Sequence, residues 1–150
     1  MSVEGRHLFR FRLERWVPYG LYAGLARALE GCVEVLDLGC GTSSMIRHFA
    51  RGRGVIGVDR YFPSLLENRR LTAYAAWVQA DIRALPFAPK SVDAVTALDV
   101  LEHLEKGEGL ARLKEWEGLA RKRVIILTPN GYVPQPASEN PWQEHRSGWT

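Results

Sequence analysis

Four aspartates are the residues in this sequence best suited to bind a ligand, because each lies at or near the end of a short apolar run. They are Asp37, Asp59, Asp81 and Asp99. The stretch "VLDLGCGTSSMI" (residues 35–46) places the first of them just before two glycines, Gly39 and Gly41. Glycine lets the backbone turn tightly and approach a ligand, and the hydroxyl residues that follow suit a helix start with free N–H groups. Carboxylates beside such a turn favour a ligand that carries positive charge or hydroxyl groups.

The elements that position these residues follow from hydrophobic patterning. Five β-branched apolar runs have the length of strands buried on both faces. They span residues 33–38, 54–59, 75–81, 91–99 and 123–129. Helical signals precede and separate them, over residues 18–30, 42–52, 63–71 and 108–123. This order predicts an α/β fold with a parallel sheet and right-handed crossovers. Such sheets bind ligands outside the carboxyl ends of their strands, so the four aspartates are expected on one rim.

Composition is that of an ordinary globular domain of 150 residues, with 46% hydrophobic and 25% charged residues. The formal charge of +3 is too mild to imply nucleic acid as a partner. No run approaches the roughly 18 apolar residues of a membrane-spanning helix, and the charged start does not resemble a secretory signal. Cys32 and Cys40 are the only cysteines, which indicates neither a disulfide framework nor a metal cluster. A cytoplasmic location is therefore the default prediction.

The ordered motifs resemble those of class I S-adenosylmethionine-dependent methyltransferases of the small-molecule type. "VLDLGCGTSS" is similar to their first motif, D/E-x-G-x-G-x-G, with Ser43 where a third glycine is usual. Further similarity lies in "GVD", "ADIRALPF", "VDAVTALDVLEHL" and "VIILTPNG". The resemblance covers roughly residues 30–135. It implies a Rossmann-like sheet with strand order 3-2-1-4-5, helices on both faces and S-adenosylmethionine as the cofactor.

The resemblance also implies which residues hold that cofactor. Asp37 and the glycine turn would hold the methionyl part, Asp59 the ribose hydroxyls and Asp81 the adenine amino group. Asp99 and the residues after it would border the sulfonium and the substrate. The complete predicted set is Asp37, Gly39, Cys40, Gly41, Asp59, Arg60, Asp81, Ile82 and Asp99.

Methyl transfer from a sulfonium depends mainly on alignment and on the exclusion of water. For an acceptor that must lose a proton, the candidate catalytic residues are Asp99, Glu102 and His103, and His145 is a further possible base. No metal is predicted, because Asp99 and Asn130 lack a convincing third ligand.

A small-molecule acceptor is predicted, with no membrane partner and no expected role for nucleic acid. The segments expected to contact it are residues 8–24, 100–108 and 129–150. Their many aromatic side chains, Tyr22, Tyr132, Trp142 and Trp149 among them, favour a partly apolar or planar acceptor.

Two alternatives stay open at this point. One is a catalytically inactive methyltransferase-like domain that acts in binding or interaction. The other is an NAD(P)-binding oxidoreductase domain, whose G-x-G-x-x-G/A fingerprint is incomplete here because Ser44 occupies the third position. In that reading a pyrophosphate would also face the carboxylate of Asp37.

The C-terminal residues 129–150 contain four prolines and no strand-like run. The family normally continues past its fifth strand with a helix and an antiparallel strand pair. We therefore expect a single domain over residues 1–150 that is truncated at its C-terminus and lacks this pair, with residues 129–150 as an irregular, lid-like segment. A bare edge on the fifth strand is expected to be covered by that segment, or by a second copy in a homodimer.

Overall fold

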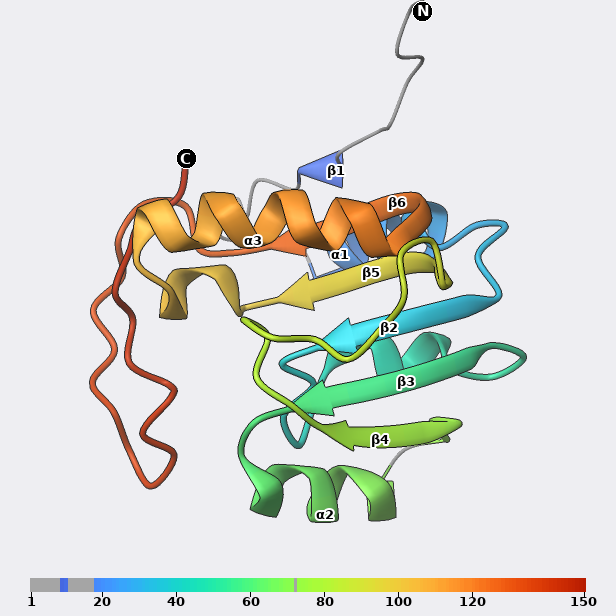
Figure 1. Cartoon of the computed structure of the whole chain (residues 1–150), viewed down its shortest axis with the longest axis horizontal. Helices are drawn as coiled ribbons and strands as arrows, with labels where there is room; N and C mark the ends of the chain where they lie inside the picture. Colours follow the sequence, from blue (N-terminus) through green and yellow to red (C-terminus); the bar gives the residue numbers. More distant parts are fainter. Residues whose placement is uncertain (1–8, 11–17, 72) are drawn as a thin grey trace, which may run out of the picture.

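A parallel sheet forms the centre of the fold (Figure 1). The computed structural model describes residues 9–10, 18–71 and 73–150. Within them the sheet has six strands in the spatial order β1-β6-β5-β2-β3-β4. Their bounds are β1 (Phe9–Arg10), β2 (Glu34–Leu38), β3 (Gly54–Asp59), β4 (Ala76–Gln79), β5 (Val92–Leu98) and β6 (Ala120–Leu127). Counted over the five predicted strands, this is the predicted order 3-2-1-4-5, which is confirmed.

Helices cover both faces of the sheet, as predicted. On one face, α1 (Pro18–Ala28), α2 (Phe62–Leu71) and the 3-10 helix η1 (Met45–Phe49) contribute to one apolar cluster. On the other, α3 (Lys106–Leu119) and the 3-10 helix η2 (Leu101–His103) contribute to a second cluster around Trp116. All seven residues of β5 are buried, because a strand between two helical layers meets apolar side chains on both faces. No helix among the described residues has the length and apolar character needed to cross a membrane.

The predicted helix over residues 42–52 is wrong in type and length. The chain forms only the short 3-10 helix η1, which begins after Ser44, whose Oγ accepts a hydrogen bond from the Ile46 N–H. Gly52 then adopts a left-handed backbone (φ 77°). The Arg53 guanidinium donates to the carbonyls of Phe49 and Cys32, and so connects this turn to the loop between α1 and β2. The chain thus returns to β3 before a regular α-helix can develop.

The predicted helix over residues 108–123 is too long at its C-terminus, because β6 begins directly at Ala120. Arg121 bonds to Glu34 and Asp93, and Arg123 donates to the carbonyl of Ala28, so this basic run is held by neighbouring elements. Gly109, Trp116 and Leu119 are the buried residues of α3, whereas Leu110 is 51% exposed.

The edge of the fifth predicted strand, β6, is covered in a way that was not expected. β1 pairs with it in parallel, Phe9 opposite Ile125 and Arg10 opposite Ile126. Residues 128–150 form no antiparallel strand pair, only isolated bridges from Asn130 and Gly131 to Trp149. This segment extends beside η2 at the carboxyl ends of the strands (Figure 1). At these two positions the edge is therefore covered by β1 and not by residues 129–150. The expected homodimer stays a prediction.

Candidate functional site

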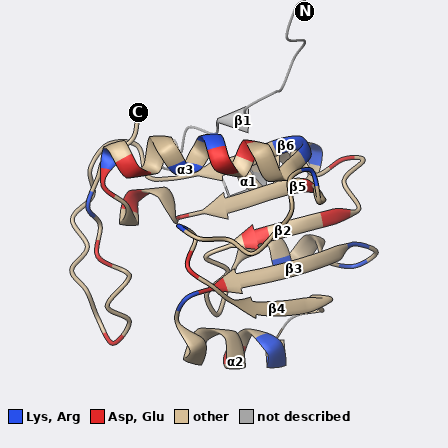
Figure 2. Cartoon of the chain, in the orientation of Figure 1, with Lys and Arg blue, Asp and Glu red and all other residues tan. Residues whose placement is uncertain are grey.

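A cavity lies outside the carboxyl ends of the strands, where the parallel sheet predicts a ligand site. Figure 2 shows acidic residues at the carboxyl ends of β2 and β3 and a basic residue directly after β3. The cavity is lined by residues that follow β2 to β5 and by part of the C-terminal segment: Gly39, Gly41, Asp59, Arg60, Asp81, Ile82, Arg83, Asp99, Val100, His103, Leu104, Asn140, Trp142, Gln143 and Arg146. The structure therefore brings together most of the predicted cofactor residues. Asp37, Cys40 and Glu102 are not among the lining residues.

The glycine turn after β2 is held in shape from two sides. Gly39 and Gly41 both have positive φ, 61° and 47°. A Cβ on Gly39 would lie 2.6 Å from Cγ2 of Val100, so this position also needs glycine for space. Asp59 fixes the turn from β3, since its Oδ2 accepts from the Gly41 N–H at 2.9 Å and its Oδ1 accepts from the Tyr61 N–H at 2.8 Å. Burial raises the pKa of the Asp59 carboxyl.

Asp37, two residues before Gly39, does not line the cavity. It follows Val35 by two residues on β2, so its side chain leaves the sheet on the Val35 face. There its carboxylate accepts hydrogen bonds from Tyr74 Oη at 2.7 Å and Thr96 Oγ1 at 2.8 Å. The residue is 1% exposed, and burial raises its pKa to about 6. Asp37 is not among the residues that line the cavity, and its carboxylate is already hydrogen-bonded within the fold. Its contact with a ligand stays a prediction.

Tyr74 and Gly57, neither of which had been predicted to take part in the site, make this arrangement possible. Tyr74 packs against Gly57, where a Cβ would lie 2.9 Å from the Tyr74 ring and 3.0 Å from Cys40 Sγ. The Cys40 thiol is buried in the same place, and only its backbone joins the turn, donating to the Val58 carbonyl at 3.0 Å. A glycine inside the β-branched run "GVIGVD" was the available signal for such a close approach.

A network of charged side chains lies on the side of the cavity formed by the ends of β3 and β4. Arg60 and Asp81 form a salt bridge at 2.8 Å. Asp81 also accepts from the Arg83 N–H at 3.0 Å, and Arg83 pairs in turn with Glu108 at 2.7 Å. The Arg60 guanidinium lies 3.5 Å from the centroid of the Trp142 ring, a cation–π contact. Arg60 thus connects the strand ends to the C-terminal segment.

The wall after β5 carries the predicted catalytic residues. Asp99 has a left-handed backbone (φ 55°), which is uncommon for a residue other than glycine and recurs at functional sites. Asp99 and His103 line the cavity, and burial raises the pKa of Asp99 and lowers that of His103. Glu102 is 2% exposed, and burial raises its pKa to about 7.

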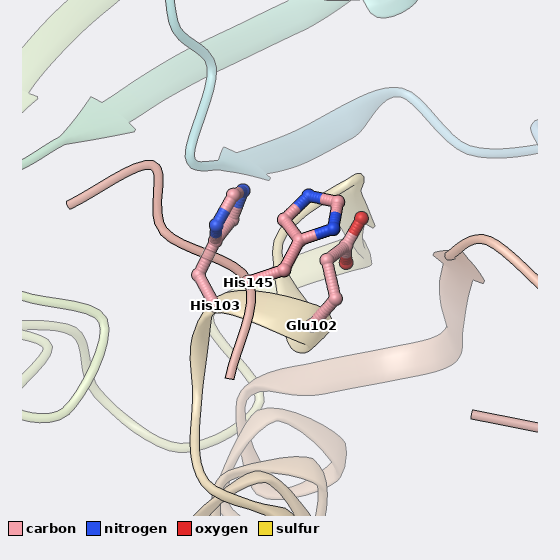
Figure 3. Close-up of side chains that lie close together, drawn as sticks. All are labelled: Glu102, His103 and His145. Atoms are coloured by element: carbon pink, nitrogen blue, oxygen red, sulfur yellow. The ribbon is translucent and has the colours of Figure 1, made fainter. Parts of the chain in front are cut away.

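The C-terminal segment contributes more to the site than its sequence indicated. Its irregular course was expected, but of its side chains on the cavity only Trp142 had been named. His145 lies beside Glu102 and His103, with the His103 and His145 ring centroids 4.9 Å apart (Figure 3). Of the other aromatic residues expected to contact an acceptor, Trp149 is buried against α3 and Tyr132 is exposed. Residues 8 and 11–17 of the predicted acceptor region lie outside the described residues.

Comparison with known proteins identifies similar chains. The family described as "Methyltransferase domain" matches residues 36–133. A 2-phytyl-1,4-naphtoquinone methyltransferase of Thermosynechococcus vestitus is 31% identical over 103 residues, which cover 64% of this chain and 42% of that protein. A trans-aconitate 2-methyltransferase of Azoarcus sp. is 37% identical over 86 residues, which cover 53% of this chain and 33% of that protein.

Among solved structures, the magnesium protoporphyrin IX methyltransferase of Synechocystis PCC 6803 with bound SAM is similar at 26% identity and a TM-score of 0.60. The similarity covers 79% of this chain and 58% of that one. The chain therefore spans less than two thirds of each of these three relatives.

Proposed function

Because the chain belongs to the methyltransferase-domain family, we propose that it binds S-adenosylmethionine in the cavity at its strand ends and transfers the methyl group to a small-molecule acceptor. The observation that carries the proposal is the Asp59 carboxylate, which lines the cavity and holds the Gly39–Gly41 turn. The names of the relatives support it: they are methyltransferases, and one contains bound SAM. The same family membership weighs against the alternative of an NAD(P)-dependent oxidoreductase.

The cofactor would lie across the rim from β4 to β5. Both Asp59 oxygens accept backbone N–H groups, and a carboxylate has acceptor sites beyond these, which would remain for the ribose hydroxyls. Asp81 and Ile82 would contact the adenine, and Arg60 would close over it with Trp142. Asp99 and the backbone of Gly39 and Gly41 would border the methionyl part. Asp37 and Cys40 would act indirectly, by supporting the turn.

Methyl transfer would require the protein mainly to align the two reactants. A nucleophilic atom of the acceptor attacks the methyl carbon as the carbon–sulfur bond breaks, and that electron pair stays on sulfur. The cavity would align the two molecules and exclude water. Asp99 lines the cavity, and its raised pKa makes it a stronger base than an ordinary carboxylate, so it would receive the acceptor's proton. Glu102 is buried behind this wall and would not touch the acceptor directly.

A small acceptor fits this wall of the site. Trp142 offers an aromatic surface, and Arg146 and His103 offer polar contacts. The acceptors in the relatives' names, a naphthoquinone, an aconitate and a porphyrin, are all small molecules. We propose an acceptor of that size that is planar or partly apolar.

Isothermal titration of the chain with S-adenosylmethionine, and separately with S-adenosylhomocysteine, tests the proposal. Saturable heat with both ligands is expected, followed by transfer of a labelled methyl group when small-molecule acceptors are screened. No heat with either ligand at millimolar concentration would contradict cofactor binding. Cofactor binding without transfer to any acceptor would favour the inactive binding domain instead.

A further inference from the structure

Glu102, His103 and His145 form a compact cluster beside the cavity, to which the proposed methyl transfer assigns no cooperative role (Figure 3). Each side chain offers one potential ligand atom, and these atoms lie within 4.8 Å of one another. Two of the residues come from η2 and the third from the C-terminal segment. The cluster thus brings a carboxylate and two imidazoles together from distant parts of the chain.

Both histidines are oriented by backbone carbonyls. His103 Nδ1 lies 3.1 Å from the Glu144 oxygen, and His145 Nδ1 lies 2.6 Å from the Val133 oxygen. A carbonyl oxygen can only accept, so each Nδ1 carries the proton, and the neutral ring then has its lone pair on Nε2. Histidines that bind metals are commonly held in this way, because the second-sphere hydrogen bond sets both tautomer and ring orientation.

Glu102 has an oxygen that lacks a partner. Its Oε2 accepts from Thr128 Oγ1 at 3.1 Å, but Oε1 is buried and has no hydrogen bond within the described part of the chain. Leaving a buried acceptor unsatisfied is costly, and such groups are rare in native structures. Figure 3 shows the carboxylate next to the His145 ring. A cation shared with the two imidazoles would satisfy this oxygen.

The backbone holds the two halves of the cluster together without an ion. The N–H groups of Arg146 and Ser147 both donate to the Glu102 carbonyl, at 2.7 Å and 3.1 Å. The His145 N–H donates to the Gln135 carbonyl at 3.0 Å. The three side chains are therefore brought together by main-chain bonds that do not depend on their own charges, as in a preorganised site.

We propose that Glu102, His103 and His145 bind a divalent transition-metal ion such as Zn²⁺. Two imidazole nitrogens and one carboxylate oxygen suit zinc, and three protein ligands leave a fourth position open. Mg²⁺ and Ca²⁺ prefer sites made of oxygen ligands. Ligand atoms ~2.1 Å from a tetrahedral ion lie about 3.4 Å apart, so the ion would draw the side chains closer together.

The open position would face the cavity, because His103 lines it. The role of the ion in catalysis rests on the proposed function. The ion would coordinate an oxygen or nitrogen of the acceptor. If that group is a hydroxyl, the ion would lower its pKa, and the hydroxyl would pass its proton to Asp99. Metal binding itself does not depend on methyl transfer and can be measured without cofactor or acceptor.

The test is metal titration of the untagged full chain after treatment with a chelator. Zn²⁺ would be followed by calorimetry and Co²⁺ by its visible absorption. We expect one ion per chain, with Zn²⁺ bound far more tightly than Mg²⁺. His145→Gln should weaken Zn²⁺ binding by at least about 100-fold, since losing a ligand costs more than losing an orienting partner. His48→Gln, which alters a histidine on η1 outside the cluster, should leave it unchanged.

A second variant controls for the possibility that His145→Gln misfolds. Glu102→Gln keeps the size of the side chain and should remain folded, while it weakens Zn²⁺ binding in the same way. Binding of S-adenosylhomocysteine, measured in parallel, should persist in both variants. Stoichiometric Zn²⁺ binding that neither variant weakens would overturn the site, and so would no binding of Zn²⁺ or Co²⁺ at millimolar concentration. If S-adenosylhomocysteine still binds in that case, only the metal site fails and the proposed function stands.

Discussion

At the scale of single residues, Asp59 both holds the glycine turn and lines the cavity. Its oxygens accept the N–H groups of Gly41 and Tyr61, and the carboxylate also lines the cavity. The geometry of the turn depends on this side chain, and the proposed recognition of a hydroxyl-rich ligand would depend on it too. A buried carboxylate with raised pKa is stabilised further when a ligand supplies donors to it.

Replacing Asp59 by alanine should weaken binding of S-adenosylhomocysteine by roughly 2–4 kcal/mol, because a charged acceptor for two hydroxyls is lost. Titration calorimetry on the folded variant measures this. Glu67→Ala, which removes an exposed acid from α2, should bind like the wild type. An Asp59→Ala chain that is folded and binds normally would refute the assignment.

Asp37 should make stability depend on pH. Its pKa rises from an ordinary 3.8 to about 6 in the folded chain because of burial. The folded state therefore holds this proton more tightly than the unfolded state. The stability linked to it is fully present below pH ~4 and is lost as the pH rises to about 6, by up to about 3 kcal/mol.

Asp37→Asn should remove this part of the pH dependence, since the amide does not ionise. Urea unfolding of both proteins between pH 4 and 7 checks it. The free energy of unfolding of the wild type should fall relative to that of the variant over this range. Parallel pH profiles would mean that Asp37 is not buried as a carboxylate.

At the scale of elements, the C-terminal segment packs closely on α3 because Gly109 has no side chain there. A Cβ on Gly109 would lie 2.6 Å from Cζ2 of Trp149, so the indole lies directly on the helix backbone. Trp149 is 7% exposed, and its Nε1–H donates to Ser147 Oγ at 2.8 Å. The segment that carries His145 and part of the cavity wall is thereby attached to α3.

Two glycines of α3 should consequently respond in opposite ways to alanine. Gly109→Ala should destabilise the chain by ~1–3 kcal/mol through overpacking against Trp149. Gly107→Ala meets nothing within 4 Å and should stabilise it by up to about 1 kcal/mol through helix propensity. Denaturant unfolding of the two variants compares them directly. Equal effects would show that Trp149 does not lie against Gly109 in solution.

At the scale of the whole molecule, the site joins the ends of several strands to the C-terminal segment. A ligand there binds only the folded chain, so it should raise the stability of the molecule as a whole. At 100 times its dissociation constant, S-adenosylhomocysteine should add about 2.7 kcal/mol. For a chain of this size, that corresponds to a rise in Tm of roughly 5–11 °C.

Thermal unfolding with and without ligand measures this rise. The same ligand concentration should give little or no shift with Asp59→Ala, and a full shift with Glu67→Ala. If Asp59→Ala were stabilised as much as the wild type, the ligand would have to bind elsewhere on the molecule.

Hydrophobic patterning predicted five of the six described strands and most of the residues at the rim, and the family resemblance supplied the strand order. Buried parallel strands are continuous apolar runs, which a short window of sequence reveals, and the aspartates that end them meet because parallel strands end at the same edge. Asp59, Asp81 and Asp99 were therefore placed correctly at the cavity. Their roles in binding and catalysis remain predictions.

Contacts between residues far apart in the chain, by contrast, became visible only in the folded structure. Asp37 lies at the same rim, yet Tyr74 and Thr96 take up its carboxylate, and neither partner lies in its local sequence. The end of α3 at Leu119 and the pairing of β1 with β6 likewise depend on neighbouring elements. His145 meets Glu102 and His103 through a segment without periodicity or caps, whose course is set by backbone bonds to Glu102. Local pattern predicts an element because its cause lies within a few residues, whereas a contact between distant segments depends on how the whole chain packs.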